Sequence, residues 1–109
     1  MKRRQLPAAS LHVLLALLEG EKHGYAIMQD VERISDGAVK MGPGTLYGTI
    51  NRLVADGLIE EVGAPDSADP AAERRRYYRL TQDGVRTADA ELDRLQTLLA
   101  RVRPQFGTA

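Results

Sequence analysis

The residues GPGTLYGTINRLVADG at positions 42–57 predict a short helix with one apolar face and one small, polar face. Pro43 suits the first position of a helix, where its missing N–H removes no hydrogen bond. Gly57 suits the end of the helix, because glycine readily adopts a positive φ. The apolar stripe expected to face a core consists of Leu46, Ile50, Leu53 and Val54.

The opposite face of this helix has the chemistry of a nucleic-acid contact. It carries no acidic side chain before Asp56 and consists of Gly44, Thr45, Gly48, Asn51, Arg52 and Ala55, with Tyr47 at its flank. Asparagine and arginine can form paired hydrogen bonds with the edges of adenine and guanine. The glycines would let the backbone approach a duplex closely. The plainer alternative is a helix face that is merely solvated.

Two more helices are predicted before this one. Residues 8–18 are apolar on nearly every side and need cover from more than one direction, part of which a second subunit could supply. Residues 24–35 predict an amphipathic helix that ends at Gly37. Its apolar positions are Ile27, Met28, Val31 and Ile34.

A two-stranded antiparallel hairpin is predicted after the third helix, with strands at 58–62 and 74–80 and a loop at 63–73. In the second strand we expect Tyr78 to be buried and Tyr77 to be exposed. Three helices followed by a hairpin form a winged helix-turn-helix, a mainly α (α+β) fold whose third helix enters the DNA major groove.

The last predicted helix begins after Thr81, a suitable cap, with Asp83 in its first turn. It carries an apolar seam spaced at alternating intervals of three and four residues, which is typical of a coiled coil. The seam consists of Val85, Ala88, Leu92, Leu95, Leu99 and Val102. Such a narrow stripe needs a partner, so we expect a dimer. The predicted domains are therefore a DNA-binding unit at 1–80 and a dimerisation helix and tail at 81–109.

Composition and charge limit the possible functions. The chain of 109 residues has 15 basic and 15 acidic side chains, but residues 56–73 carry six acids and no base. Residues 74–79 carry four arginines and no acid, so the local charge is strongly uneven. Four arginines favour contact with DNA over the alternative of a charged strand edge that prevents aggregation. There is no cysteine, no nucleophile or phosphate-loop motif and no metal-ligand spacing. We therefore expect no enzyme, metal or cofactor, and a cytoplasmic location.

Several motifs together resemble the PadR family of bacterial transcriptional regulators. They are His23-Gly24-Tyr25, Pro43-Gly44-Thr45-Leu46-Tyr47, Asn51-Arg52-Leu53, Asp56-Gly57-Leu58-Ile59 and Arg76-Tyr77-Tyr78-Arg79-Leu80-Thr81 with Gly84. The resemblance implies a homodimeric repressor that binds operator DNA, uses its C-terminal helix to dimerise and is released by a small, often phenolic, effector. The chain departs from many members at Gly42 and Gly48, and its last helix has no tryptophan.

These observations define two sets of candidate residues. The predicted DNA contacts are Tyr25, Lys40, Gly44, Thr45, Tyr47, Gly48, Asn51, Arg52, Arg74, Arg75 and Arg76. The predicted dimer contacts are Leu11, Leu15, Val85, Ala88, Leu92, Leu95, Leu99 and Val102. Further candidates for phosphate contact are Lys2, Arg3 and Arg4, although a charged N-terminus is often only solvated.

Two other functions remain open from the sequence. The first reading is a DNA-binding regulator on a pseudopalindromic operator. The alternatives are a small-molecule sensor with a ligand between its subunits and an adaptor that holds a protein. The acidic 56–73 stretch keeps the adaptor possible.

Overall fold

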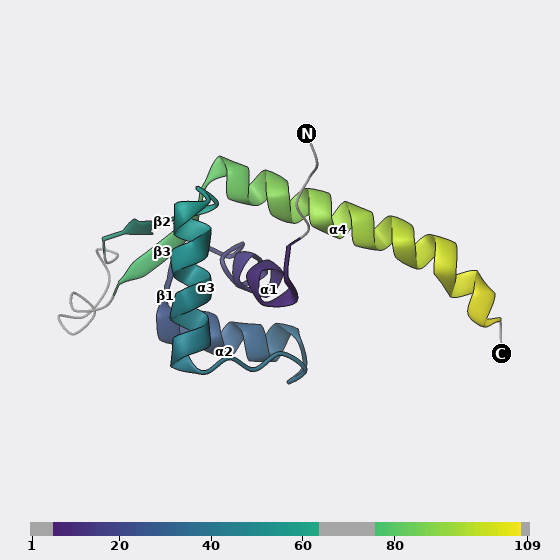
Figure 1. Ribbon diagram of the computed structural model, residues 1–109, viewed down its shortest axis with the longest axis horizontal. Helices are drawn as coiled ribbons and strands as arrows, with labels where there is room; N and C mark the ends of the chain where they lie inside the picture. The colour runs from purple at the N-terminus through teal and green to yellow at the C-terminus, as the bar shows by residue number, and fades with distance from the viewer. Residues whose placement is uncertain (1–5, 64–75, 108–109) are drawn as a thin grey trace.

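Three short helices and a small sheet enclose one core, and a long fourth helix extends away from it (Figure 1). The computed structural model describes residues 6–63 and 76–107. The order of elements is α1 (Ala8–Ala16), β1 (Lys22–His23), α2 (Gly24–Ile34), α3 (Pro43–Ala55), β2 (Ile59–Val62), β3 (Tyr77–Leu80), α4 (Gln82–Val102) and a 3-10 helix (Arg103–Phe106). The predicted winged helix-turn-helix with a C-terminal helix is confirmed.

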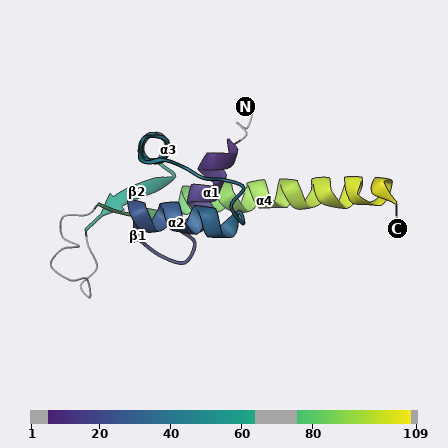
Figure 2. The same ribbon diagram turned by 90° about the horizontal axis from the view of Figure 1, so that it is seen from below.

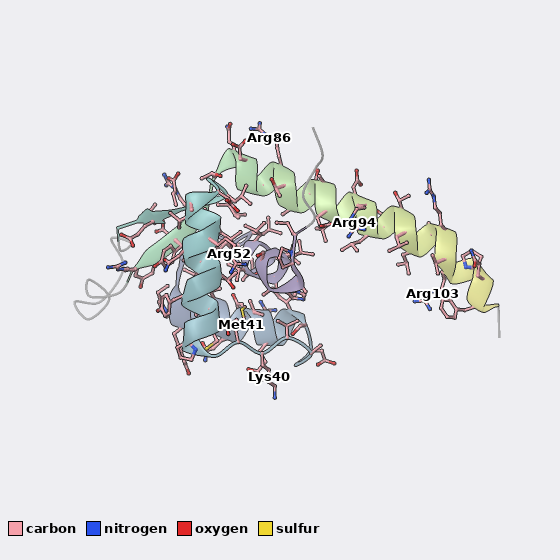
Figure 3. The ribbon with its side chains drawn as sticks, viewed as in Figure 1. Lys40, Met41, Arg52, Arg86, Arg94 and Arg103 are labelled. Atoms are coloured by element: carbon pink, nitrogen blue, oxygen red, sulfur yellow. The ribbon has the colours of Figure 1, made fainter. Side chains whose placement is uncertain are left out.

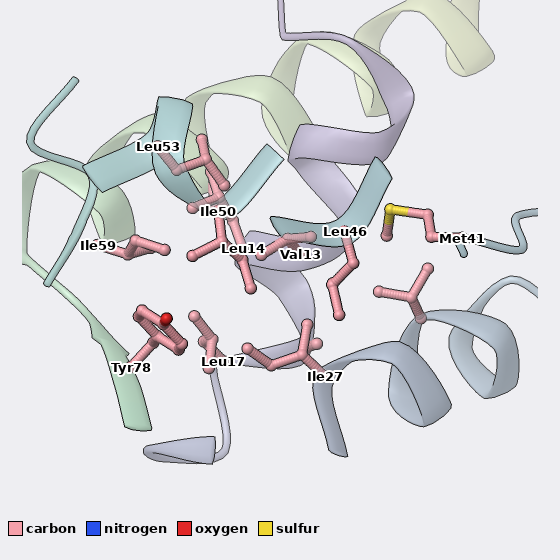
Figure 4. Close-up of a cluster of buried hydrophobic side chains, with 13 residues drawn as sticks. Val13, Leu14, Leu17, Ile27, Met41, Leu46, Ile50, Leu53, Ile59 and Tyr78 are labelled. Atoms are coloured by element: carbon pink, nitrogen blue, oxygen red, sulfur yellow. The ribbon is translucent and has the colours of Figure 1, made fainter. Parts of the chain in front are cut away.

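The core is formed by apolar side chains from the three helices, β2 and β3 (Figure 4). Fully buried side chains include Leu14, Ile27, Leu46, Ile50, Leu53 and Ile59. The prediction for Val54 is wrong, because this side chain is 40% exposed and Thr49 is buried instead. Positions 46, 49, 50 and 53 follow the i, i+3, i+4, i+7 spacing of one helix face, and Val54 lies beside that face. Ile34, predicted for the buried stripe of α2, is likewise exposed at the end of its helix.

The sheet has three antiparallel strands in the order β1-β3-β2, one more than the predicted hairpin. The added strand pairs Lys22 with Tyr78 and His23 with Tyr77. The prediction that Tyr77 is exposed is wrong: it is buried, and the His23 ring lies edge-on to the Tyr77 ring at 5.5 Å between centroids. A strand of two residues covers this side of the sheet, and it is too short to produce a recognisable alternation in the sequence.

Side-chain caps hold the starts of α2 and α4, and the cap by Thr81 was predicted. The Nδ1 atom of His23 accepts a hydrogen bond from the N–H of Ala26 at 3.2 Å at the start of α2. The Oγ1 atom of Thr81 accepts from the N–H of Gly84 at 3.0 Å, and its hydroxyl donates to the carbonyl of Gly57 at 2.6 Å. Gly57 has the expected positive φ, at 75°. The start of α3 at Gly42 has no side-chain cap, as its sequence implies.

The first half of α4 packs on the winged unit, and its second half does not. Gly84 lies directly against the backbone carbonyl of Leu58, in space that a Cβ atom would occupy. Ala88 and Glu91 are buried on the side of α4 that faces α1. Beyond Leu95 every residue of α4 is exposed. The winged unit therefore covers only the near half of this helix. Among the described residues, no helix is both long and apolar enough to cross a membrane.

We expect Gly84→Ala to lower the free energy of unfolding by about 1–3 kcal/mol, because the new methyl group overlaps a backbone atom that cannot move aside. Urea denaturation followed by circular dichroism measures this change. Gly48→Ala is the matched control, since a Cβ atom there meets open space and alanine favours a helix. Equal stability of Gly84→Ala and the original chain would contradict the assigned packing.

We also expect the stability contributed by Asp30 to depend on pH. The hydrogen bond from Lys22 holds the pKa of the Asp30 carboxyl below its usual value, and Arg33 acts in the same direction. The ionised carboxylate therefore stabilises the fold above its unfolded pKa of about 3.9, and this stability is lost as the pH falls through the folded pKa. Asp30→Asn should cost about 1 kcal/mol at pH 7 and nothing at a pH below both values.

Urea titrations at neutral and at acid pH test this prediction. Asp89→Asn, at an exposed position of α4, serves as the control and should change stability at neither pH. The same loss for Asp30→Asn at both pH values would show that charge is not the cause.

Candidate nucleic-acid interface

The outer face of α3 stands clear of the other elements on one side of the molecule (Figure 2). All the residues predicted for this face are exposed, namely Gly44, Thr45, Tyr47, Gly48, Asn51, Arg52 and Ala55. Gly42, Gly44 and Gly48 carry no side chain and meet no neighbouring atom, so the start of the helix presents bare backbone. A second macromolecule can therefore approach α3 closely at this end.

A hollow of about 560 Å³ lies on one flank of α3, between this helix, the start of α2 and β3. Its lining residues are His23, Gly24, Tyr25, Tyr47, Asn51, Arg76 and Tyr78. The Tyr47 hydroxyl lies where a side chain on Gly24 would begin, so the two helices meet here because residue 24 has no Cβ atom. The structure thus brings together predicted contacts from three elements that are distant in the sequence.

Arg76 is the basic side chain of this hollow. Its Nε atom lies 3.7 Å from Oε1 of Glu61, and the side chain is 75% exposed. Arg79 differs, because its Nε and Nη2 atoms donate to Oε1 of Glu60 at 2.9 and 2.7 Å across the sheet. Arg79 is therefore held closely by Glu60, whereas Arg76 is more exposed and its pair with Glu61 is longer. Arg74 and Arg75 lie outside the described residues.

The Tyr78 hydroxyl of the hollow stays protonated at physiological pH. Burial raises the pKa of the Tyr78 hydroxyl above its usual value, and the negative charge of Glu61 raises it further, against the opposing effect of Arg76. Tyr25 is more exposed, at 58%, and lies at the second residue of α2. Tyrosine hydroxyls and the N–H groups at the start of a helix are hydrogen-bond donors suited to a phosphate.

Arg52 lines a different hollow from Tyr47 and Asn51, on the other flank of α3. It lines a groove of about 1080 Å³ with Asp56, the chain at Leu6 and Pro7, and residues of α4. Consecutive helical residues differ by about 100°, so Asn51 and Arg52 necessarily point to different sides. The predicted DNA contacts therefore divide between two hollows. No ion pair of Arg52 occurs within the described part of the chain.

Lys40 lies in the loop before α3 and extends into solvent (Figure 3). Its Nζ atom is 3.9 Å from Oε1 of Glu32, and both side chains are more than half exposed. Such an exposed pair is weak and can exchange for a phosphate.

Both histidine rings lie against backbone atoms in the first turn of a helix. His23 caps α2, and Nδ1 of His12 lies 2.7 Å from the carbonyl oxygen of Ala8. Residues 6–63 and 76–107 contain no group of three metal-ligating side chains.

The predicted dimer contacts differ in how much surface they leave for a partner. Leu11 and Ala88 are buried within the chain, and Leu15 and Leu95 are half-buried. The exposed part of the seam consists of Val85, Leu92, Leu99 and Val102. Two notable residues were not predicted from the sequence. Phe106 is 77% exposed just after α4, and Glu91 is buried. An aromatic residue in a polar tail was a usable signal for Phe106, whereas a charge at a helix surface gave no sign of burial.

Comparisons with known proteins agree with this geometry. Residues 13–90 match the model of the transcriptional regulator PadR-like family. The protein named transcriptional regulator Rv3488 of Mycobacterium tuberculosis is 39% identical over 101 residues, which cover 93% of this chain and 87% of that protein. An uncharacterised 37.1 kDa protein in transposon TN4556 of Streptomyces fradiae is 36% identical over 97 residues, and the match spans 86% of this chain but only 25% of that protein.

A solved structure shares the fold. The crystal structure of Bacillus subtilis PadR in complex with operator DNA superposes with a TM-score of 0.65 at 19% identity, over 79% of this chain and 47% of that one. The family match over most of the chain, the close relative and the shared fold lead to one assignment: the chain belongs to the PadR-like family of transcriptional regulators.

Proposed function

We propose that the protein is a homodimer that binds a pseudopalindromic DNA operator through α3 and the wing. The observation that carries this proposal is the face of α3, which is exposed, free of acidic side chains from residue 37 to residue 55, and flanked by Arg52 and Arg76. A polyanion is attracted by the potential of the face it touches, so the zero net charge of the chain does not oppose binding. The operator complex of the Bacillus subtilis relative supports the same assignment.

The two hollows suggest that different residues contact the DNA backbone and the bases. Tyr25, Tyr47 and Arg76 surround one hollow and fit a backbone phosphate, which fixes the position of the protein on the duplex. Asn51 lies nearer the middle of the outer face and is placed for a base edge, with Gly44 and Gly48 allowing the close approach. Arg52 serves either a base or a phosphate on the opposite flank.

A dimer is supported by the apolar surface that α4 leaves uncovered. Four residues of the seam are between 36% and 54% exposed, and the far half of α4 has no cover within the chain. Pairing of two such helices would bury this surface and hold two copies of α3 about one DNA turn apart, roughly 34 Å, as a two-fold operator requires.

We further infer repression that a small lipophilic or phenolic effector relieves. A dimer on an operator excludes other proteins from the same DNA. The rigid junction of α4 with β2 and α3 supports the release step, because a ligand that favours a different pairing of the two α4 helices also changes the distance between the α3 helices.

The wing contact predicts a change in the salt dependence of binding. Arg76→Ala should weaken binding to every DNA sequence and reduce the slope of log affinity against log salt concentration by about 0.9, the effect of one lost phosphate contact. Fluorescence anisotropy with a labelled duplex, titrated at several salt concentrations, measures both quantities.

Arg101→Ala removes the same charge from an exposed position at the far end of α4 and is the control. An unchanged affinity and slope for Arg76→Ala would refute the wing contact. Failure of the original chain to bind any duplex at low salt, with capture of a protein instead, would refute DNA binding altogether.

The dimer predicts that a charge on the exposed seam separates the subunits. Leu99→Glu places a carboxylate where the partner helix would bury it, and an unpaired buried charge is costly. We expect a monomer by sedimentation equilibrium and a loss of operator affinity. Thr97→Glu, on the opposite side of the same helical turn, should remain a dimer. Two dimeric variants would show that the subunits meet elsewhere.

A further inference from the structure

The groove of about 1080 Å³ lies where the start of α1, the end of α3 and residues 83–94 of α4 come together. α1 packs against both α3 and α4, so each helix supplies part of the wall (Figure 1). The groove shares no lining residue with the hollow that contains Arg76. Its volume is sufficient for a small organic molecule, since pockets for such ligands measure about 300–1,000 Å³.

Part of the lining is apolar and comes from all three helices and their flanking segments. It consists of Leu6, Pro7, Leu53, Leu58 and Ala90. Leu53 belongs to the core, and Leu58 and Ala90 are half-buried. A ligand gains affinity here by removing an apolar group of its own from water.

Two hydroxyl groups in the lining have no partner in the protein. Ser10 of α1 is 2% exposed, and Thr87 of α4 is half-buried. Neither hydroxyl forms a hydrogen bond with any group in residues 6–63 and 76–107. Within these residues every wholly buried side-chain oxygen or nitrogen has a partner, so the Ser10 oxygen is reached from the groove. A buried hydroxyl needs a hydrogen bond, and here the bond must come from a water molecule or a ligand.

The charged side chains of the groove divide into paired and unpaired groups. The paired ones are Arg86 with Asp83 and Arg94 with Glu91. In the described part of the chain, neither Arg52 nor Asp56 forms an ion pair.

Arg52 and Asp56 therefore offer two opposite charges side by side. They are four residues apart at the C-terminal end of α3, a spacing that places both side chains on one side of a helix. A base four residues before an acid is the less favourable order for pairing within a helix, which agrees with the absence of a bond between them. The groove thus presents a free guanidinium and a free carboxylate next to an apolar lining.

We propose that this groove binds an α-amino acid with a large apolar side chain. Arg52 binds the carboxylate of the ligand and Asp56 binds its ammonium group, while the apolar lining covers its side chain. Ser10 and Thr87 hydrogen-bond to its remaining polar atoms. A zwitterion fits because its two charges are carried on one carbon atom, whereas a ligand with a single charge leaves either Arg52 or Asp56 unmatched.

Such a ligand would oppose DNA binding, and this part of the inference rests on the proposed function. Arg52 is a proposed DNA contact, and a ligand that holds its guanidinium removes that contact from the duplex. Because coupling between two binding events is reciprocal, operator DNA should weaken ligand binding by the same factor as the ligand weakens DNA binding.

The ligand class is tested with three indole compounds. The chain contains no tryptophan, so indole fluorescence, excited beyond the absorption of tyrosine, reports the ligand alone. The probes are L-tryptophan, tryptamine, which lacks the carboxylate, and indole-3-propionate, which lacks the ammonium group. L-tryptophan should bind at least about ten-fold more tightly than either analogue, since each loses one charged hydrogen bond.

Variants of the two charges should each remove one part of this discrimination. Arg52→Gln should bind L-tryptophan no better than tryptamine, and Asp56→Asn should bind it no better than indole-3-propionate. Arg101→Gln and Asp89→Asn remove the same charges from exposed positions outside the groove and should keep the full discrimination. Thermal unfolding by circular dichroism identifies any variant that has lost the fold.

The Ser10 hydroxyl gives an independent test. Ser10→Ala should weaken L-tryptophan binding without lowering the free energy of unfolding, because the hydroxyl it removes has no partner among the described residues. A loss of stability with unchanged ligand affinity would show that Ser10 serves only the fold.

The outcomes separate the site from its effect on DNA. Equal binding of the three probes, or no binding of L-tryptophan, overturns the amino-acid site. Binding of L-tryptophan that leaves the affinity for a selected operator duplex unchanged, measured by anisotropy, overturns the link to DNA and leaves the site. A chain that binds no duplex refutes the proposed function, while the fluorescence titration still tests the groove.

Discussion

The contact between Gly84 and the carbonyl of Leu58 determines how the two parts of the molecule are joined. Because residue 84 has no side chain, the first turn of α4 lies directly on the segment that connects α3 to β2. Thr81 strengthens the junction through backbone and side-chain hydrogen bonds to Leu58 and Gly57. The direction of α4, and with it the position of the exposed seam relative to α3, follows from this contact. In the proposed dimer, such a joint would hold the two α3 helices at a defined spacing.

The proposed DNA-binding face is organised around the angle between neighbouring residues of α3. Asn51 and Arg52 are adjacent in sequence, yet they line separate hollows on either side of the helix. One hollow is completed by the wing and the start of α2, and the other by the chain entry and α4. Contacts on both flanks would hold α3 against rotation about its own axis, so that its small central residues face the bases.

The sequence was sufficient to predict the helices, the wing and the exposed face of α3, because each depends on local periodicity or on a cap. Gly57 follows the end of α3 with a positive φ, and Thr81 caps the start of α4, as their chemistry requires. Predictions of burial failed where packing in the folded structure determines which side chains are covered. Tyr77 is buried beside β1, whose His23 ring packs edge-on against it, and Val54 is exposed because the buried face is centred on Thr49 and Leu53. The pairing of Glu91 with Leu6 joins the middle of α4 to the chain before α1, 85 residues away, and no local pattern in the sequence reports such a contact.

The uncovered far half of α4 has a consequence for how the protein responds to its own abundance. A helix of this length is marginally stable without a partner, so its order and the pairing of subunits are linked. If the subunits pair through the seam, operator occupancy at low expression rises with about the square of the monomer concentration, as mass action requires for a two-chain binding unit. Gene control by such a protein would then have a threshold set by synthesis and turnover, in addition to any signal from a small molecule.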